Sequence, residues 1–286
     1  MSANEPELPI RKIVVALDAS SSSRALLEAA AELAARFHTE LVGLFVEDAQ
    51  LVDLAGSPFF REISRFSASA HQLSSAQLER QLRGQASQMQ RVLTEITGRR
   101  QVPSTLRIVR GQVVNELLRA AAETDLIILG RVGQSFVRQQ SAPKRLGSTT
   151  RVFLTQAPCL TLVWQQETRL GLPMVVVYDN SAAAQRALSL AARLVQEREG
   201  RLTVILLDNT LEAIQQAEQQ VRAWLQTRGL TAHFHKLTNT NVARLAQIVM
   251  QERARIMVLP GTNAALQGEA LLALLDELRT SVLIVQ

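Results

Sequence analysis

The sequence contains one cysteine, Cys159, in 286 residues. A single cysteine cannot form a disulfide within the chain, which excludes the small disulfide-stabilised secreted folds. The first residues, MSANEPELPIRK, lack the apolar segment of a secretory signal, and no apolar run approaches the ~18 residues that a membrane helix needs. These absences favour a cytoplasmic protein without a membrane anchor.

Aromatic residues are also scarce, at 4% of the chain, whereas hydrophobic residues as a whole reach 47%. That hydrophobic content supplies enough apolar surface for one or two full cores. The net charge of +5 is compatible with an anionic partner, but the arginines are scattered between glutamines and glutamates. Because few aromatic rings are available for base stacking, nucleic-acid binding is not favoured.

One phrase of the sequence occurs twice. VVALDAS, from Val14 to Ser20, returns as VVVYDNS, from Val175 to Ser181, at an offset of 161 residues. The same offset, without a gap, joins Leu27 to Leu188, Ala30 to Ala191, Leu33 to Leu194 and Leu41 to Leu202. A register held for this long indicates two copies of one unit. We predict one domain at residues 1–165 and a second at residues 166–286.

Each copy alternates apolar runs of strand length with helical patterns. The predicted strands are 12–18, 40–46, 104–110, 125–130 and 159–164 in the first copy and 173–178, 201–207, 231–237, 255–259 and 281–285 in the second. Helices are predicted between them, in the first copy at 21–37, 75–97, 112–123 and 147–156. Strands that are apolar at consecutive positions suit a parallel sheet covered on both faces. The predicted fold is α/β, with two tandem doubly wound, Rossmann-like domains of five parallel strands each.

Residues 49–75 have no counterpart in the second copy. They combine glycine, proline and many serines with Phe59, Phe60 and Phe66. A long insertion after the carboxyl end of a strand is typical of a lid or binding loop. A surface insert with packed phenylalanines explains the composition equally well. Residues 165–172 form the expected linker between the copies.

The first copy has an unusual distribution of glycines after its fourth strand, although the common motifs G-x-x-x-x-G-K-[ST] and G-x-G-x-x-G are absent. The strand ends at Gly130, Gly133 follows, and Gly147-Ser148-Thr149 opens a predicted helix. Glycine lets the main chain approach a ligand, and N–H groups at a helix start favour an anion. These parts suit phosphate groups, but turn glycines and a helix cap also explain them.

With Asp18 at the end of the first strand, this pattern resembles that of the universal stress protein family. ATP-binding members carry Gly-x2-Gly-x9-Gly-[Ser/Thr] after the fourth strand and an aspartate after the first strand that contacts adenine. The tail APCLTLV also resembles the last strand of the family. The resemblance implies an adenine nucleotide alpha hydrolase-like fold and a stress-response protein that binds ATP, with or without Mg²⁺, in its first copy. The site residues that it implies are Asp18, Ser20, Val46, Leu129, Gly130, Arg131, Gly133, Gly147, Ser148 and Thr149.

The glycine loop departs from the family pattern in length. Thirteen residues separate Gly133 from Gly147, where the family pattern has nine. A longer surface loop costs little closure entropy, so the loop is still able to fold back. It carries Arg138, Lys144 and Arg145 close to the expected phosphates. A solvated basic loop is the alternative interpretation.

The second copy reads VLPGTNAALQGEALLALLDEL at the corresponding place. Pro260 replaces the leading glycine, and Glu269 aligns with Gly147. A carboxylate at a helix start repels phosphate while it stabilises the helix. We therefore expect the second copy to keep the fold without the site, and Asp179, with Ser181, to cap a helix. Asp18 is able to cap its own helix, to contact adenine, or to do both.

Other chemistry is weakly represented. His233 and His235 alternate on a predicted strand and so share a face, a geometry that can chelate a metal, but no third ligand is recognisable. No metal site and no catalytic constellation are predicted. Glu47 and Asp48 are the nearest acids for slow ATP hydrolysis, the enzymatic alternative to regulatory binding. A scaffold that binds no nucleotide is the third possibility.

Members of the family commonly dimerise through their fifth strands, which suggests why the unit occurs twice. Strand 160–164 would meet strand 282–285 within one chain, closing two exposed sheet edges. We expect such an intramolecular pseudo-dimer. The sequence leaves a further homodimer and the protein partners open.

Overall fold

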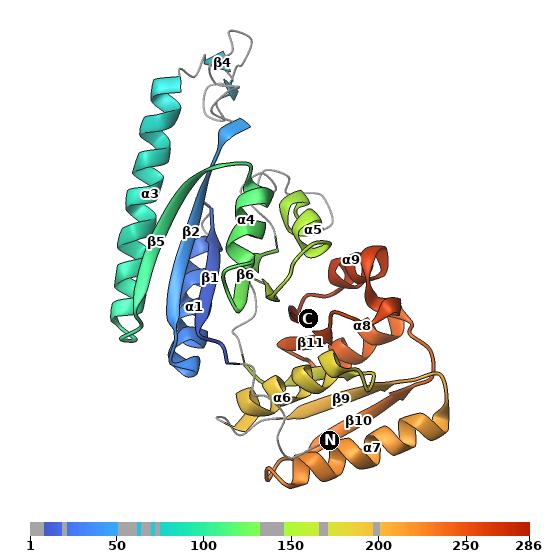
Figure 1. The fold of residues 1–286 in the computed structure, drawn as a ribbon. Coiled ribbons are helices and arrows are strands. Elements are labelled where there is room, and N and C mark those ends of the chain that lie inside the picture. Colours follow the sequence, from blue (N-terminus) through green and yellow to red (C-terminus); the bar gives the residue numbers. More distant parts are fainter. Residues whose placement is uncertain are drawn as a thin grey trace.

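The computed structural model of the chain describes residues 9–18, 22–50, 62–63, 70–71, 75–131, 146–165, 171–196 and 201–286. One ten-stranded sheet runs through both copies (Figure 1). The first copy contributes β1 (Lys12–Leu17), β2 (Glu40–Asp48), β5 (Ser104–Gly111), β6 (Leu126–Gly130) and β7 (Leu160–Trp164). The second contributes β8 (Met174–Tyr178), β9 (Leu202–Leu207), β10 (Ala232–Leu237), β11 (Ile256–Pro260) and β12 (Ser281–Val285). All ten predicted strands are confirmed, with ends that differ by at most two residues.

The strand order is β5-β2-β1-β6-β7-β12-β11-β8-β9-β10, so the second copy repeats the order of the first in reverse across the sheet. Neighbouring strands within a copy are parallel, whereas β7 and β12 are antiparallel. Their register places Leu283 opposite Leu162 and Val282 opposite Val163. The predicted pairing of the two fifth strands is confirmed, and the copies form a pseudo-dimer joined by main-chain hydrogen bonds.

Helices cover both faces of the sheet. One face carries α1 (Ser22–Phe37), α3 (Ser75–Gly98), α6 (Ala182–Gln196) and α7 (Leu211–Gln226). The other carries α4 (Val113–Ala121), α5 (Ser148–Leu154), α8 (Val242–Gln251) and α9 (Gly268–Glu277). Each face buries a large apolar cluster that continues through both copies, and successive residues of β1 alternate between these two clusters. This is the doubly wound α/β arrangement that the sequence predicts.

Helix α1 shows how local sequence places a strand end and a helix start beside each other. Its Leu26, Ala30, Leu33 and Phe37 are buried at helical spacing against the sheet. The helix ends where His38 adopts a φ of 52°, a left-handed conformation typical of the residue after a helix. The packed helix therefore returns the chain to β2 and holds its own first turn against the end of β1.

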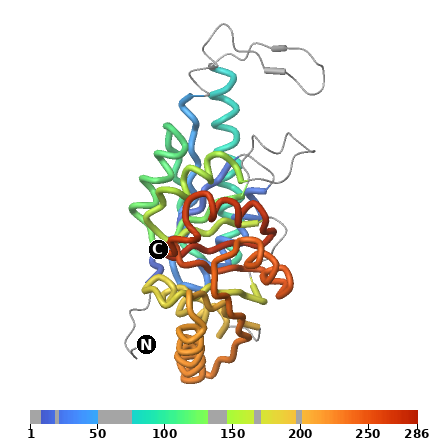
Figure 2. Tube along the Cα trace, turned by 90° about the vertical axis from the view of Figure 1, so that its right-hand side faces the viewer, coloured from blue at the N-terminus to red at the C-terminus, as the bar shows by residue number. Residues whose placement is uncertain are grey.

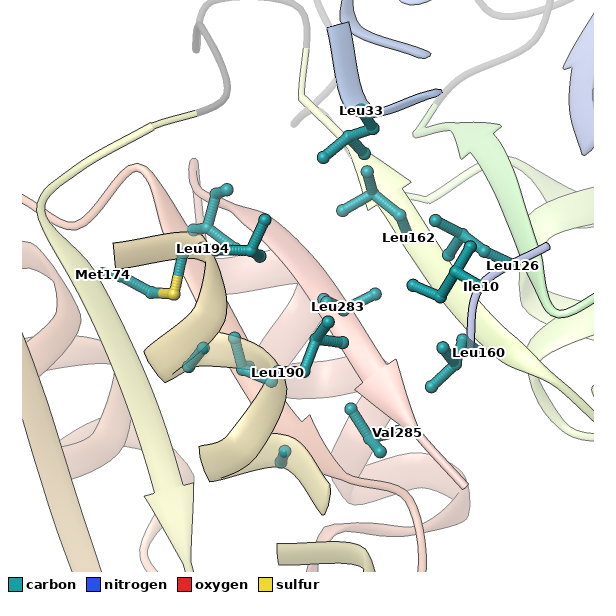
Figure 3. Close-up of a cluster of buried hydrophobic side chains, with 14 of the residues drawn as sticks. Ile10, Leu33, Leu126, Leu160, Leu162, Met174, Leu190, Leu194, Leu283 and Val285 are labelled. Atoms are coloured by element: carbon teal, nitrogen blue, oxygen red, sulfur yellow. The ribbon is translucent and has the colours of Figure 1, made fainter. Parts of the chain in front are cut away.

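The junction between the copies is apolar on the α1 and α6 face. Leu126, Leu160 and Leu162 of the first copy gather with Leu190 and Leu283 of the second (Figure 3). Burying one such side chain contributes about 1.5–3 kcal/mol, so several leucines together stabilise the pairing of β7 with β12. The two copies lie end to end, and Gln286 lies between them (Figure 1, Figure 2).

The insertion at 49–75 lies largely outside the described residues. Within it the structure describes an antiparallel pair, β3 (Glu62–Ile63) and β4 (Ala70–His71), which precedes α3. Both interpretations of the insert, lid or surface packing, stay predictions. Residues 166–170 of the expected linker also lie outside the described part. Among the helices that the structure describes, none combines the length and apolarity needed to cross a membrane.

Candidate functional site

The candidate site lies beyond the carboxyl ends of β1 and β6. These strands are neighbours, and Val15 of β1 pairs with Ile128 of β6. The chain crosses from β1 to β2 on one side and later enters β6 on the other, so the strand order reverses between them. Ligands of open α/β sheets bind at such a reversal. Asp18 directly follows β1 and Gly130 ends β6, so the structure brings the two ends together.

Asp18 is fixed by the first turn of α1. The Ser23 hydroxyl lies 2.8 Å from Asp18 Oδ1 and 2.6 Å from the Asp18 carbonyl oxygen, and Ser23 is buried. The Asp18 N–H donates to the same hydroxyl at 3.3 Å. These contacts tie Asp18 to the first turn of α1 through the Ser23 side chain, and the main-chain cap suggested for Asp18 stays a prediction. They orient the carboxylate at the strand end and leave its role toward adenine untested.

The opposite wall is the start of α5. Gly147 is the N-cap, and its N–H donates to the Arg131 carbonyl at 2.9 Å, which ties the two ends of the glycine loop together. The Thr150 hydroxyl donates to the Gly130 carbonyl at 3.1 Å. Ser148 is exposed and Thr149 is half-buried at this helix start. The loop between these ends, including Gly133 and its basic residues, lies outside the described residues, as does Ser20.

Two further predicted site residues belong to the core beneath the crevice. Leu129 is 3% exposed within the cluster on the α4 and α5 face, and Val46 packs against that cluster from β2. Both side chains therefore belong to strands and pack in the core below the strand ends, and neither comes from a loop of the site.

The Arg131 side chain lies against the second copy. Its guanidinium donates to the Leu278 carbonyl and, at 3.0 Å, to the Asp276 carbonyl at the end of α9. A cation at a helix C-terminus satisfies carbonyls that lack intrahelical partners. Burial lowers the pKa of Arg131, and the Asp276 carboxylate opposes this effect. The guanidinium thus serves the contact between the copies in this structure.

Asp276 makes the complementary contacts. Its Oδ1 accepts from the Leu146 N–H at 2.8 Å, and its Oδ2 pairs with the Arg151 guanidinium. Arg131 and Leu146 stand on either side of residues 132–145. The last turn of α9 therefore holds both ends of the glycine loop of the other copy.

In the second copy, a protein side chain bridges the corresponding strand ends. Asn263, which follows β11, donates its side-chain amide to Asp179 Oδ2 at 2.7 Å. Asp179 Oδ1 accepts from the Ser181 N–H at 3.1 Å, and the Ser181 hydroxyl accepts from the Ala184 N–H at 3.1 Å. The structural role predicted for Asp179 and the helix cap predicted for Ser181 are confirmed.

The predicted alignment of Glu269 with Gly147 is wrong by two residues. The N-cap of α9 is Gln267, which corresponds to the N-cap Gly147 of α5. The connection from β11 to α9, which contains the 3-10 turn η1 (Ala264–Leu266), has fewer residues than the connection from β6 to α5, so counting from the glycines misplaces the helix start. Glu269 still lies in the first turn of α9, where its charge disfavours an anion.

The two acids considered for ATP hydrolysis each contact a nearby residue, one through an ion pair and the other through a hydrogen bond. Glu47 lies 3.0 Å from Arg110 Nη2, and Asp48 accepts from the Gln50 N–H at 3.0 Å. In the described part of the chain, these contacts hold both carboxylates at the end of β2.

Sequence reasoning placed His233 and His235 on one face of a strand but missed the third member of their cluster. Glu252, the C-cap of α8, lies between the two histidines of β10, with its Oε1 3.0 Å from His233 Nδ1 and 2.9 Å from His235 Nε2. Helix α8 runs back along the sheet, so its end meets the amino-terminal half of β10. The contact could have been anticipated only from the topology, because a helix that follows a strand returns along the sheet and brings its end close to the start of that strand.

A sequence model of the universal stress protein family matches residues 9–164. The chain belongs to the universal stress protein family. The match ends at the last residue of β7, so it covers the first copy, whereas the second copy is related to it by the repeat and the fold. No curated protein sequence matches the chain.

Solved structures of universal stress proteins share the tandem fold. One from Archaeoglobus fulgidus DSM 4304 has a TM-score of 0.71 at 16% identity and covers 96% of this chain and 98% of its own. Another, described as a universal stress protein from Pseudomonas aeruginosa UCBPP-PA14, has a TM-score of 0.62 at 17% identity, with coverage of 98% and 94%. A functionally unknown protein from Pseudomonas aeruginosa PAO1 has a TM-score of 0.61 at 17% identity, with coverage of 98% and 93%. Similarity at these identities concerns the fold alone.

Proposed function

We propose that this universal stress protein binds ATP in the crevice of its first copy and acts in a stress response by binding rather than by turnover. The observation that carries the proposal is the difference between the two crevices in the residues that the structure describes. The first has Asp18 and Gly130 at adjacent strand ends, with the start of α5 beside them. The second is bridged by the hydrogen bond from Asn263 to Asp179.

The residues fit an adenine nucleotide in the following way. Asp18 contacts the adenine, the main chain at Gly130 and Gly133 approaches the phosphates, and the hydroxyls of Ser148 and Thr149 donate to them. Ser20, Val46 and Leu129 complete the site that the family resemblance implies, with Gly147 as the cap. Mg²⁺, if present, is held mainly by phosphate oxygens and water, which suits a site rich in donors and poor in carboxylates.

Binding without turnover is supported by the state of the nearest acids. Glu47 is paired with Arg110 and Asp48 accepts from the Gln50 N–H, so both carboxylates already have partners at the end of β2, and the proposal gives neither a catalytic role. Occupancy of the crevice would instead change the surface that the glycine loop offers to a protein partner.

The test is calorimetric titration of the full chain with ATP, with and without Mg²⁺, after mass spectrometry of denatured protein has shown whether nucleotide co-purifies. We expect one ATP per chain. Ser148→Glu places a carboxylate in the first turn of α5, where acids favour the helix, so the variant folds but repels phosphate. It should lower ATP affinity by at least about tenfold, the equivalent of ~1.4 kcal/mol.

Matched variants separate a lost site from a lost fold. Ser148→Gln has a similar size without the charge and should bind more tightly than Ser148→Glu. Gly130→Val should abolish binding, whereas Pro260→Ala at the corresponding end of β11 should leave it unchanged. ADP formation with phosphate release would favour a weak ATPase. No binding of any adenine nucleotide would refute the proposal and favour a scaffold.

A further inference from the structure

Two histidines and a glutamate converge near the edge of the sheet that is farthest from the first copy. His233 and His235 point from the same face of β10, the last strand in the sheet order. Phe234, between them, packs on the opposite face with the α7 cluster. Glu252 reaches them from the end of α8, which covers the same face of the sheet as the two histidines. The cluster is separate from the nucleotide crevice, because helix α8 ends at the edge of the sheet where its strands begin.

The donor atoms lie close enough together for one metal ion to reach all three after side-chain adjustment. His233 Nδ1, His235 Nε2 and one Glu252 oxygen all lie within 4.8 Å of one another. The two nitrogens are 3.0 and 2.9 Å from the same Oε1. Around a tetrahedral zinc ion with bonds of about 2.0–2.1 Å, neighbouring donors are separated by about 3.3 Å. The two nitrogen–oxygen separations lie within a few tenths of an ångström of that value, and the nitrogen–nitrogen separation, at most 4.8 Å, has to close by up to about 1.5 Å when an ion binds.

The other oxygen of the Glu252 carboxylate, Oε2, accepts a hydrogen bond on the side away from the histidines. The Thr203 hydroxyl donates to Glu252 Oε2 at 3.2 Å, and both residues are buried. This contact orients Oε1 toward the imidazoles, as outer-shell hydrogen bonds orient metal ligands. Arg201 Nη1 lies 4.0 Å from Oε2, but its side chain is 64% exposed, so solvent screens its charge.

The exposure of the three ligands is graded. The side chain of Glu252 is 9% exposed, that of His235 is 23% and that of His233 is 55%. The carboxylate is thus fixed inside, and the site opens toward solvent beside His233. A water molecule has access to the fourth position, as in zinc sites with three protein ligands.

From this geometry we propose that His233, His235 and Glu252 bind a divalent transition-metal ion of the zinc class in the second copy. Two imidazoles and one carboxylate form a ligand set suited to such ions. The ion binds the ring nitrogen of each imidazole that now faces Oε1, in the neutral tautomer that carries its single proton on the other nitrogen, and any proton in excess of one per ring is released to solvent. The bound metal joins the edge strand β10 to the end of α8.

The experiment is a zinc titration of the untagged full chain in competition with a chromophoric chelator. We expect one Zn²⁺ per chain, and Co²⁺ in its place should give the visible absorption of a four-coordinate site. His235→Ala and Glu252→Gln should each lower the zinc affinity by more than about 100-fold, since loss of an outer-shell partner alone costs up to that amount. Glu252→Gln retains an acceptor oxygen for both imidazoles, so this variant remains folded.

The control is a double variant, His38→Asn with His71→Asn, which removes the two histidines outside the cluster. His38 is exposed at a φ of 52°, a conformation that asparagine tolerates. The control should bind zinc as the natural chain does. Zinc should raise the unfolding midpoint of the natural chain and of the control but not of His235→Ala.

Two results would overturn the proposal. One is the absence of stoichiometric zinc binding by the natural chain. The other is unchanged affinity in both His235→Ala and Glu252→Gln, which would assign the zinc to another place. Because the titration contains no nucleotide, failure here leaves the proposed ATP site unaffected.

Discussion

Asp276→Ala removes the acceptor for two contacts that cross between the copies. The variant loses the hydrogen bond from the Leu146 N–H, at 2.8 Å, and the ion pair with Arg151. Hydrogen bonds to charged groups contribute about 1.5–3 kcal/mol each. The side chains of Arg151 and Asp276 are 30% and 23% exposed, which places the ion pair near the lower limit. We expect the free energy of unfolding to fall by about 3 kcal/mol.

The assay is urea unfolding of the full chain at neutral pH, followed by tryptophan fluorescence. Trp164 lies on β7 and Trp224 on α7, so the two tryptophans report on different copies. Because Asp276 holds the glycine loop of the other copy, the transition reported by Trp164 should move to lower urea concentration. The same variant should weaken ATP binding, since both ends of the loop lose an anchor.

Glu277→Ala is the matched control, because Glu277 is the exposed neighbour of Asp276 on the same helix turn. It should change the free energy of unfolding by less than about 0.5 kcal/mol. In a double-mutant cycle, Asp276→Ala and Arg151→Ala should show a coupling of at least about 1 kcal/mol. Equal effects of Asp276→Ala and Glu277→Ala would refute the reasoning that α9 anchors the loop.

Three further outcomes are expected. Burial raises the pKa of the Cys159 thiol to about 11, so at pH 8 iodoacetamide should react more than about 100-fold more slowly than with an exposed cysteine; a comparable rate would contradict this. Leu162→Ala opens a cavity at the junction and should cost about 2–5 kcal/mol in urea unfolding, and a cost below ~1 kcal/mol would show that the junction collapses around the gap. Asn263→Ala breaks the contact with Asp179 and should lower the free energy of unfolding by about 1.5–3 kcal/mol. The ATP stoichiometry in calorimetry should stay at one per chain, because Glu269 still disfavours phosphate in the second copy. A stoichiometry of two would indicate that the hydrogen bond from Asn263 to Asp179 alone closes the second crevice.

The strands were accessible to sequence reasoning because most of them are apolar runs with a clear end. LIILG and IMVLP, for example, stop at Gly130 and Pro260, and the structure ends β6 and β11 at those residues. The pairing of β7 with β12 was predicted from the resemblance to a family whose members commonly pair their fifth strands, together with the repeat in this chain. The strands thus depend on local composition, and their pairing between copies was implied by the resemblance.

The missed features depend on contacts between distant residues. The Arg131 guanidinium meets carbonyls near residue 277, a place that loop composition does not indicate. Glu252 reaches the histidines through the return path of a helix, and a carboxylate at a helix end has many other uses. The start of α9 was misplaced by two residues because the connection before it is shorter than its counterpart in the first copy and contains a 3-10 turn. None of these contacts leaves a periodic pattern from which to predict it.

The antiparallel pair of β7 and β12 has a consequence for how the protein responds to dilution. The two strands belong to one polypeptide, so their encounter is governed by the effective concentration that the connecting chain imposes and not by the amount of protein in solution. Their association is a first-order process, and the pair persists at any dilution at which the chain stays folded. Because both fifth strands are already occupied, a second molecule that joins this one has to use a different surface.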